Sequence, residues 1–193
     1  MMRATGARGG EAGTSMLEVL ITLVVLVFGL LALAALQLKI QSLDMESYQR
    51  AQAMLLLRDM AERIKANSAN AAVYVPGPGT MYGTGYTPTC PGTTQAEIDI
   101  CEWSNALQGA SESSSGTNVG AMIGARGCIQ EINAPDPTSG VCLPGTYRVA
   151  VAWQGLLATS APSLSCATGQ YGSNAAMRRV ISSDIVIGLP ACL

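Results

Sequence analysis

The chain has 193 residues, which is enough for one globular domain of ordinary size and a membrane anchor. It contains no histidine, which excludes histidine-based metal sites and nucleophile triads that depend on a histidine base. Its formal net charge of −2 excludes the basic surface that nucleic-acid binding requires, and its 12% charged residues suit an extracytoplasmic protein.

The N-terminal region combines a short positive segment with a long apolar run. Residues 1–13 contain two arginines against one acidic residue, which is typical of a segment that stays in the cytoplasm. The run from Val19 to Leu36 has no charge and approaches the ~20 residues that a helix needs to cross a bilayer. We therefore predict a leader at 1–13 and a transmembrane half-helix at 14–37.

Glu18 places a carboxylate at the entrance of the apolar run. An unpaired charge at hydrocarbon depth costs about 2.5–3.5 kcal/mol, so such a residue needs a partner and implies a function. If the chain is cut after Gly13, Glu18 becomes the fifth residue, and the new amino terminus of a neighbouring copy could be that partner. Glu18 is therefore a candidate pairing group between subunits.

Two other interpretations of this region stay open. Ala32-Leu33-Ala34 has the small-residue pattern of an ordinary secretory signal, whose cleavage would leave a secreted protein that begins at Ala35. A plain single-pass anchor explains the length of the apolar run but leaves Glu18 without a role.

The segment Gly13-Thr14-Ser15-Met16-Leu17-Glu18-Val19-Leu20 follows the basic leader and resembles the N-terminal signature of type IV prepilins. The resemblance implies that a prepilin peptidase cuts between Gly13 and Thr14 and methylates the new amine of Thr14. It also implies that Glu18 pairs with the amine of an adjacent subunit during assembly. Thr14 departs from the family, which more often carries Phe or Met at this position.

The helix is expected to continue beyond the apolar run. Residues 37–66 contain neither Gly nor Pro and are rich in good helix formers, so we predict one near-continuous helix from Thr14 to about Asn67. Its second half, 38–68, is predicted to be amphipathic. The apolar residues expected to face a globular domain recur at roughly helical spacing: Leu43, Ala51, Met54, Leu55, Ala61 and Ile64.

Residues 69–193 are predicted to form a β-rich globular domain, which gives a type IV pilin-like α+β fold with an antiparallel sheet packed on the helix. The Gly- and Pro-rich stretch 75–92 and the Ser/Gly-rich stretch 109–118 are expected to be loops. Alternating β-formers predict strands at Gly127–Asn133, Thr146–Gln154 and Arg178–Ile187.

A short helix is predicted from Ala96 to Leu107. Its acidic residues are expected to lie on a solvated face: Glu97, Asp99 and Glu102. Trp103 and Trp153 are expected in the core. We find no nucleophile with a base, no phosphate loop and no metal-ligand set, so we expect no catalytic site, cofactor or metal.

Six cysteines follow the apolar run, and none forms a CxxC pair. An even number in the exported part predicts disulfides and an oxidising compartment such as the periplasm. Of the 15 possible pairings we prefer bonds between sequence neighbours: Cys90–Cys101, Cys128–Cys142 and Cys166–Cys192.

Three segments, 50–67, 147–155 and 178–180, are similar to the minor pilins called type IV pilus modification protein PilV. The resemblance implies a minor pilin that starts in the inner membrane with a periplasmic C-terminal domain and ends in the extracellular pilus. Its implied partners are other major and minor pilins, the prepilin peptidase and the inner-membrane assembly platform, and its implied roles are priming of assembly, twitching motility and adhesion. A minor pseudopilin of type II secretion and a ligand-binding tip adhesin remain alternatives.

Overall fold

The computed structural model describes residues 14–87, 90–110, 113–114, 117–118, 120 and 122–189. The chain divides into two compact units, Met1–Asp44 and Met45–Leu193, and the boundary between them falls inside the first helix.

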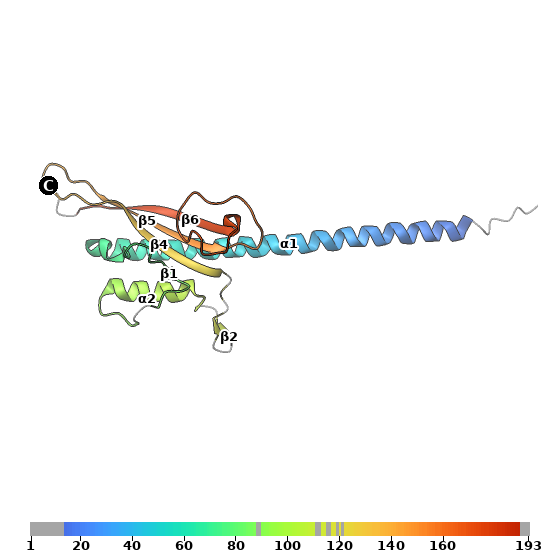
Figure 1. Cartoon of the computed structure of the whole chain (residues 1–193), viewed down its shortest axis with the longest axis horizontal. Helices are drawn as coiled ribbons and strands as arrows, with labels where there is room; N and C mark the ends of the chain where they lie inside the picture. The colour runs from blue at the N-terminus through green and yellow to red at the C-terminus, as the bar shows by residue number, and fades with distance from the viewer. Residues whose placement is uncertain are drawn as a thin grey trace, which may run out of the picture. The chain divides into compact units, whose positions relative to one another are not determined.

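Helix α1 runs without interruption from Thr14 to Ala66, which confirms the predicted continuous helix (Figure 1). In the first unit its side chains from Ser15 to Gln41 are all exposed. Two hydroxyl groups of this unit bond to the helix itself: Thr22 Oγ1 donates to the carbonyl of Val19 and Ser42 Oγ to that of Leu38. By length and composition, α1 is long and apolar enough to cross a membrane.

In the second unit, the buried face of α1 differs from the one that the sequence predicts. Ala61 and Ile64 are buried as expected, but Ala51, Met54 and Leu55 are exposed, and so is Leu43 at the end of the first unit, so the prediction is wrong for these four residues. The buried stripe instead consists of residues at spacings of three and four: Gln49, Ala53, Leu57, Met60, Ala61 and Ile64. Large apolar side chains occur on two faces of this helix, and the face with the small Ala53 is the one that packs.

The sheet of the second unit has the strand order β1-β4-β5-β6, and all its pairs are antiparallel. Its strands are β1 (Tyr82–Gly83), β4 (Ile123–Asn133), β5 (Gly145–Gln154) and β6 (Arg178–Ile187). The three long strands agree with the predicted ones, and the predicted α+β architecture of a long helix and an antiparallel sheet is confirmed.

Two hydrophobic clusters cover the two faces of the sheet, which explains why β5 is buried along most of its length. The larger cluster joins the buried stripe of α1, helix α2 (Gln95–Leu107) and one sheet face, and it includes Trp103 and Trp153. The smaller cluster lies on the other face, where Cys166, Ala167 and Tyr171 from the β5–β6 connection pack against β4 and β5. Both tryptophans are core residues, as predicted.

Close packing between α2 and β4 depends on a glycine. A Cβ atom at Gly127 would lie 2.2 Å from the ring of Trp103. Any residue other than glycine at this position would therefore have to displace the ring. The indole Nε1 of Trp103 donates to the carbonyl of Leu56 on α1 at 2.8 Å. Trp103 therefore ties α2 both to the sheet and to α1.

The remaining elements are short. They are the 3-10 helices η1 (Ser68–Tyr74) and η2 (Ala175–Met177) and the paired strands β2 (Ser113–Ser114) and β3 (Thr117–Asn118). The last two fall in the stretch 109–118 that was predicted to be a loop, of which 111–112 and 115–116 lie outside the described residues.

Two disulfides are described in full. Cys90 is bonded to Cys101, the pair that the sequence predicts, but Cys128 is bonded to Cys166. The predicted pairs Cys128–Cys142 and Cys166–Cys192 are therefore wrong, because the β5–β6 connection folds back over the sheet and brings Cys166 onto β4. Cys142 is also disulfide-bonded, and Cys192 lies outside the described residues.

Candidate assembly site

The first part of α1 is an apolar surface that nothing in its own unit covers. Between Met16 and Leu38 the large apolar side chains range from 45% exposed at Val24 to 77% exposed at Met16. No charged residue occurs between Glu18 and Lys39. A continuous apolar surface of this kind marks a contact with lipid or with other proteins.

Glu18 lies at the beginning of this surface. It is exposed and stands four residues after Thr14, the first residue of α1, so the two positions are neighbours on one face of the helix. The unpaired N–H groups at the start of a helix favour a carboxylate there. The described part of the chain thus places an acid at the helix start, directly before the apolar surface.

In the second unit, α1 is held to the β5–β6 connection by Glu46. Its Oε1 accepts hydrogen bonds from the backbone N–H groups of Leu156 and Leu157 at 3.0 and 3.1 Å. The same oxygen accepts a hydrogen bond from Arg179 Nη2 at 2.9 Å, and these two side chains are only 20% and 16% exposed. Glu46 therefore fixes α1 close to the point where the helix enters this unit.

Two adjacent arginines at the start of β6 fasten different parts of the β5–β6 connection. Arg179 bonds to Glu46 and to the carbonyl of Leu157. Arg178 is 6% exposed, and its guanidinium donates to the carbonyls of Pro162, Leu164 and Cys166. Successive residues of a strand point to opposite sides, so one dipeptide can hold both the beginning and the middle of the connection.

A polar cluster joins the C-terminal end of α1 to α2. Arg63 forms ion pairs with Asp59 at 3.0 Å, with Asp99 at 3.0 Å and with Glu102 at 2.7 Å. Burial disfavours the charged guanidinium, but the hydrogen bonds to the three carboxylates outweigh this effect and raise the pKa of Arg63. Arg63 thus remains a cation that bridges two helices.

Asp99 is the buried member of this cluster, with 4% of its surface exposed. Its carboxylate accepts hydrogen bonds from the hydroxyl of Tyr74 and from Gln95 Nε2, in addition to Arg63. The prediction of a solvated face is therefore wrong for Asp99. Burial and the hydrogen bond to Asp99 raise the pKa of Tyr74 to about 12.

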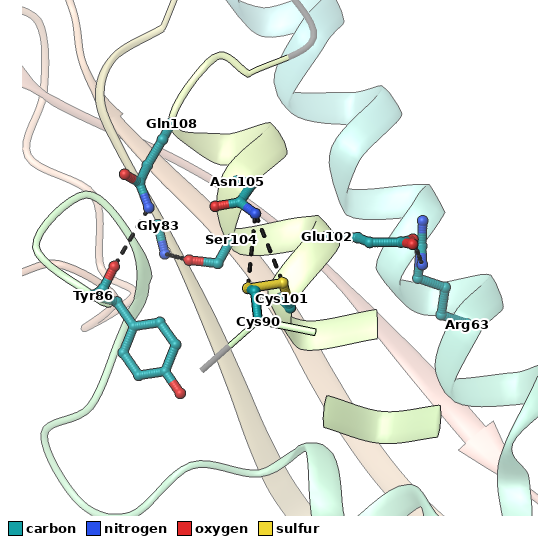
Figure 2. Close-up of a disulfide and its surroundings, with 9 residues drawn as sticks. All are labelled: Arg63, Gly83, Tyr86, Cys90, Cys101, Glu102, Ser104, Asn105 and Gln108. Carbon is teal, nitrogen blue, oxygen red and sulfur yellow. Dashed lines mark hydrogen bonds and ion pairs between the residues drawn. A yellow bond between two sulfur atoms is a disulfide. The ribbon is translucent and has the colours of Figure 1, made fainter. Parts of the chain in front are cut away.

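The other side of α2 is fastened to the loop after β1, as Figure 2 shows. The Cys90–Cys101 disulfide links the loop to the helix, and Asn105 Nδ2 approaches its two sulfur atoms at 3.9 and 3.7 Å. Ser104 Oγ accepts a hydrogen bond from the backbone N–H of Gly83 at 3.0 Å. Helix α2 is thus held by a disulfide and hydrogen bonds to β1 and the loop after it on one side, and by ion pairs to α1 on the other.

Two of the predicted site residues, Thr14 and Glu18, lie together at the start of α1. Gly13 lies outside the described residues, Thr14 begins α1, and Glu18 follows one turn later. Glu46 and Arg179 were not predicted to have a role, and Asp99 was expected on a solvated face. Helical spacing was the available signal for two of them, since Asp99 lies four residues before the buried Trp103 and Glu46 lies seven residues before the buried Ala53.

A long apolar helix, exposed in its first part and packed on an antiparallel sheet in its second, defines a subunit of the pilin-like class. Residues 35–101 match a family model described as Tt1218-like, type IV pilin Tt1218, and this match supports the type IV pilin family for the chain. The type IV pilin family is a family of structural proteins. No curated protein and no solved structure matches the chain.

The matched segment covers the second part of α1, η1, β1 and the first half of α2. It contains every member of the polar cluster around Arg63 and Asp99 except Glu102. The family match and the apolar N-terminal helix together suggest anchoring in a membrane and assembly into a pilus.

Proposed function

We propose that this chain is a minor pilin, a structural subunit that helps to prime and build a type IV pilus. The observation that carries the proposal is the exposed apolar surface of α1, with Glu18 at its beginning and an unbroken helix behind it. The similarity of three segments to PilV-type minor pilins supports the minor role. Twitching motility and adhesion are the cell-level functions that a subunit of this kind serves.

In this proposal the precursor is a single-pass protein of the inner membrane, with its C-terminal part in the periplasm. Residues 1–13 are the leader, 14–37 and 38–68 are the membrane and amphipathic parts of the helix, and 69–193 are the globular domain. A prepilin peptidase removes the leader between Gly13 and Thr14 and methylates the amine of Thr14.

The assembly platform of the inner membrane then transfers the subunit into a bundle with other major and minor pilins. Glu18 pairs there with the amine of a neighbouring subunit. A charge pair inside an apolar bundle fixes the register of the subunits, because an unmatched charge in the same place is costly.

The test is the mass and N-terminal sequence of the mature protein purified from membranes. We expect a chain that begins with N-methylthreonine at position 14, and we expect Gly13→Ala to keep the leader attached. An N-terminus at Ala35 would refute the proposal and establish the secretory interpretation.

A further inference from the structure

Half of strand β4 lacks a neighbouring strand on one side. Strand β5 pairs with β4 along almost its whole length, whereas β1 pairs with it only through Tyr82↔Gly127 and Gly83↔Arg126. Within the described sheet, the edge of β4 from Cys128 to Asn133 therefore has no partner on the side of β1. In Figure 1 this strand runs past the short β1.

A groove of about 710 Å³ lies along this edge. Residues 128–132 of β4 form one wall, and the loop 75–81 and the segment 165–170 form the others. The Cys128–Cys166 disulfide fixes the last of these walls to the strand. The volume falls in the range of about 300–1,000 Å³ that is usual for sites that bind a ligand.

The backbone of β4 presents hydrogen-bonding groups to this groove. The carbonyl of Ala125 accepts a hydrogen bond from the N–H of Thr84 at 2.9 Å, so the backbone groups of Ala125 point toward β1. In an antiparallel ladder every second residue directs its N–H and C=O to the same side. The N–H and C=O groups of Ile129 and Glu131 therefore point into the groove.

The loop before β1 is not built to satisfy these groups. Continuing the register of β1 would place Thr80 opposite Ile129 and Pro78 opposite Glu131. Proline has no N–H to donate, so the loop lacks the donor that the ladder would need at Pro78. The groove thus separates a strand edge from a loop that is unsuited to pair with it.

We propose that this groove binds an extended segment of a partner protein as an added strand, antiparallel to β4 and in line with β1. Main-chain bonds to Ile129 and Glu131 would supply the affinity, as in other cases of strand addition to a sheet edge. Among the described residues that line the groove, Glu131 is the one with a charged side chain, so the segment carries a basic residue at that place. The exposed carboxylate of Glu131 also accepts a hydrogen bond from the hydroxyl of Tyr147 on β5.

The experiment measures binding of the peptide acetyl-Thr-Val-Lys-Val-Thr-Val-amide to the full chain in detergent micelles by calorimetry. We expect a dissociation constant below about 1 mM. Two further peptides carry N-methyl groups at residues 2 and 4 or at residues 3 and 5. Because only alternate N–H groups of an added strand face β4, one pattern should weaken binding at least tenfold and the other should not.

Variants of Glu131 separate the main-chain contact from the charge. Glu131→Pro removes an N–H that faces the groove and leaves the ladder with β5 intact, so we expect a folded protein that loses binding. Glu131→Gln should weaken binding of the lysine peptide and leave unchanged the binding of a peptide with threonine in its place. Equal effects of the two methylation patterns, or no binding by the unaltered chain, would overturn the proposal. Neither result bears on cleavage at Gly13, which tests the proposed pilin function independently.

Discussion

At the scale of single residues, burial decides which charged side chains matter for stability. Arg63 contacts three carboxylates, but Asp59 and Glu102 are 42% and 57% exposed whereas Asp99 is 5% exposed in its side chain. A hydrogen-bonded charge that is buried loses much more on removal of its partner than a charge that water can solvate. The three contacts have similar lengths and should contribute very different free energies.

Replacement of Asp99 by Asn should test this difference. Asp99→Asn keeps the shape of the side chain but removes the charge that Arg63 and Tyr74 contact, so we expect a loss of about 1–3 kcal/mol in the free energy of unfolding. Urea denaturation of the chain in detergent, followed by tryptophan fluorescence, measures the loss.

The matched control is Glu102→Gln, on the same helix and against the same arginine. Its exposed pair should contribute less than about 1 kcal/mol. Equal losses for the two variants would show that burial does not set the energetics of this cluster.

The sequence predicted residue roles well where one property dominated. The absence of charge in 19–36 identified the exposed apolar helix, and size and hydrophobicity placed Trp103 and Trp153 in the core. It failed for Asp99, because an isolated acidic residue on a helix is usually solvated and its partners come from other elements. The helical spacing from the buried Trp103 favours a buried position for Asp99, whereas its charge favours a solvated one.

At the scale of elements, helix α1 in the second unit carries apolar residues on two faces, and only one face packs. The sequence could predict the helix but not which of its two apolar faces is buried. That choice depends on how closely the sheet and α2 approach α1. Ala53, with no exposed surface, permits that approach, while the larger Leu55 remains 67% exposed.

Two leucines on α1 allow a matched comparison. Leu57 is 6% exposed, so Leu57→Ala should create a cavity and lower the free energy of unfolding by about 2–5 kcal/mol. Leu55→Ala, two residues earlier on the outer face, should change it by no more than about 0.5 kcal/mol. Thermal unfolding by circular dichroism distinguishes the two, and a larger effect at Leu55 would contradict the observed face.

The N-terminal cap of α2 should make the free energy of unfolding depend on pH in the acidic range. The carboxylate of Glu97 accepts backbone hydrogen bonds from Thr94 and Thr93, which lower its pKa to about 2 from 4.5, and Thr94 caps the helix in return. Because the folded-state pKa is the lower one, this stabilisation is complete above pH 4.5 and is lost as the pH falls toward 2.

Glu97→Gln provides the test for this cap. Glutamine accepts the same hydrogen bonds but does not titrate, so the difference in urea midpoint between the two proteins should shrink between pH 6 and pH 3, where Glu97 of the unfolded chain takes up a proton while folded Glu97 is still ionised. A difference that stays constant with pH would show that the charge of Glu97 does not contribute.

At the scale of the whole molecule, the two units differ in what they expose and what they bury. The first presents an apolar helix with a single acid at its beginning, and the second buries two clusters around a sheet. Fold class and helix length followed from composition and periodicity. The Cys128–Cys166 bond did not, because it depends on the path of the β5–β6 connection, which has little periodic pattern.

The proposed role of Glu18 in assembly can be distinguished experimentally from any effect on cleavage of the leader. Glu18→Ala should leave the leader cleaved and the second unit equally stable, yet strongly reduce the number of pili, because the amine of a neighbour would then be buried without a partner. Electron microscopy of cells and the mass of the membrane protein measure the two effects. Glu62→Ala, 70% exposed in the second unit, is the control that should assemble normally, and normal piliation by Glu18→Ala would refute the role.

The Cys128–Cys166 bond also bears on the order of events as the chain is made. A chain that emerges with its N-terminus first exposes Cys142 before Cys166, so the earliest available partner of Cys128 is not its final one. Oxidation of Cys128 before Cys166 emerges can only join it to a cysteine other than its final partner, such as Cys142, and thiol–disulfide exchange must then release that bond. Formation of the Cys128–Cys166 bond therefore requires either such an exchange or a delay of oxidation until 38 further residues have followed Cys128.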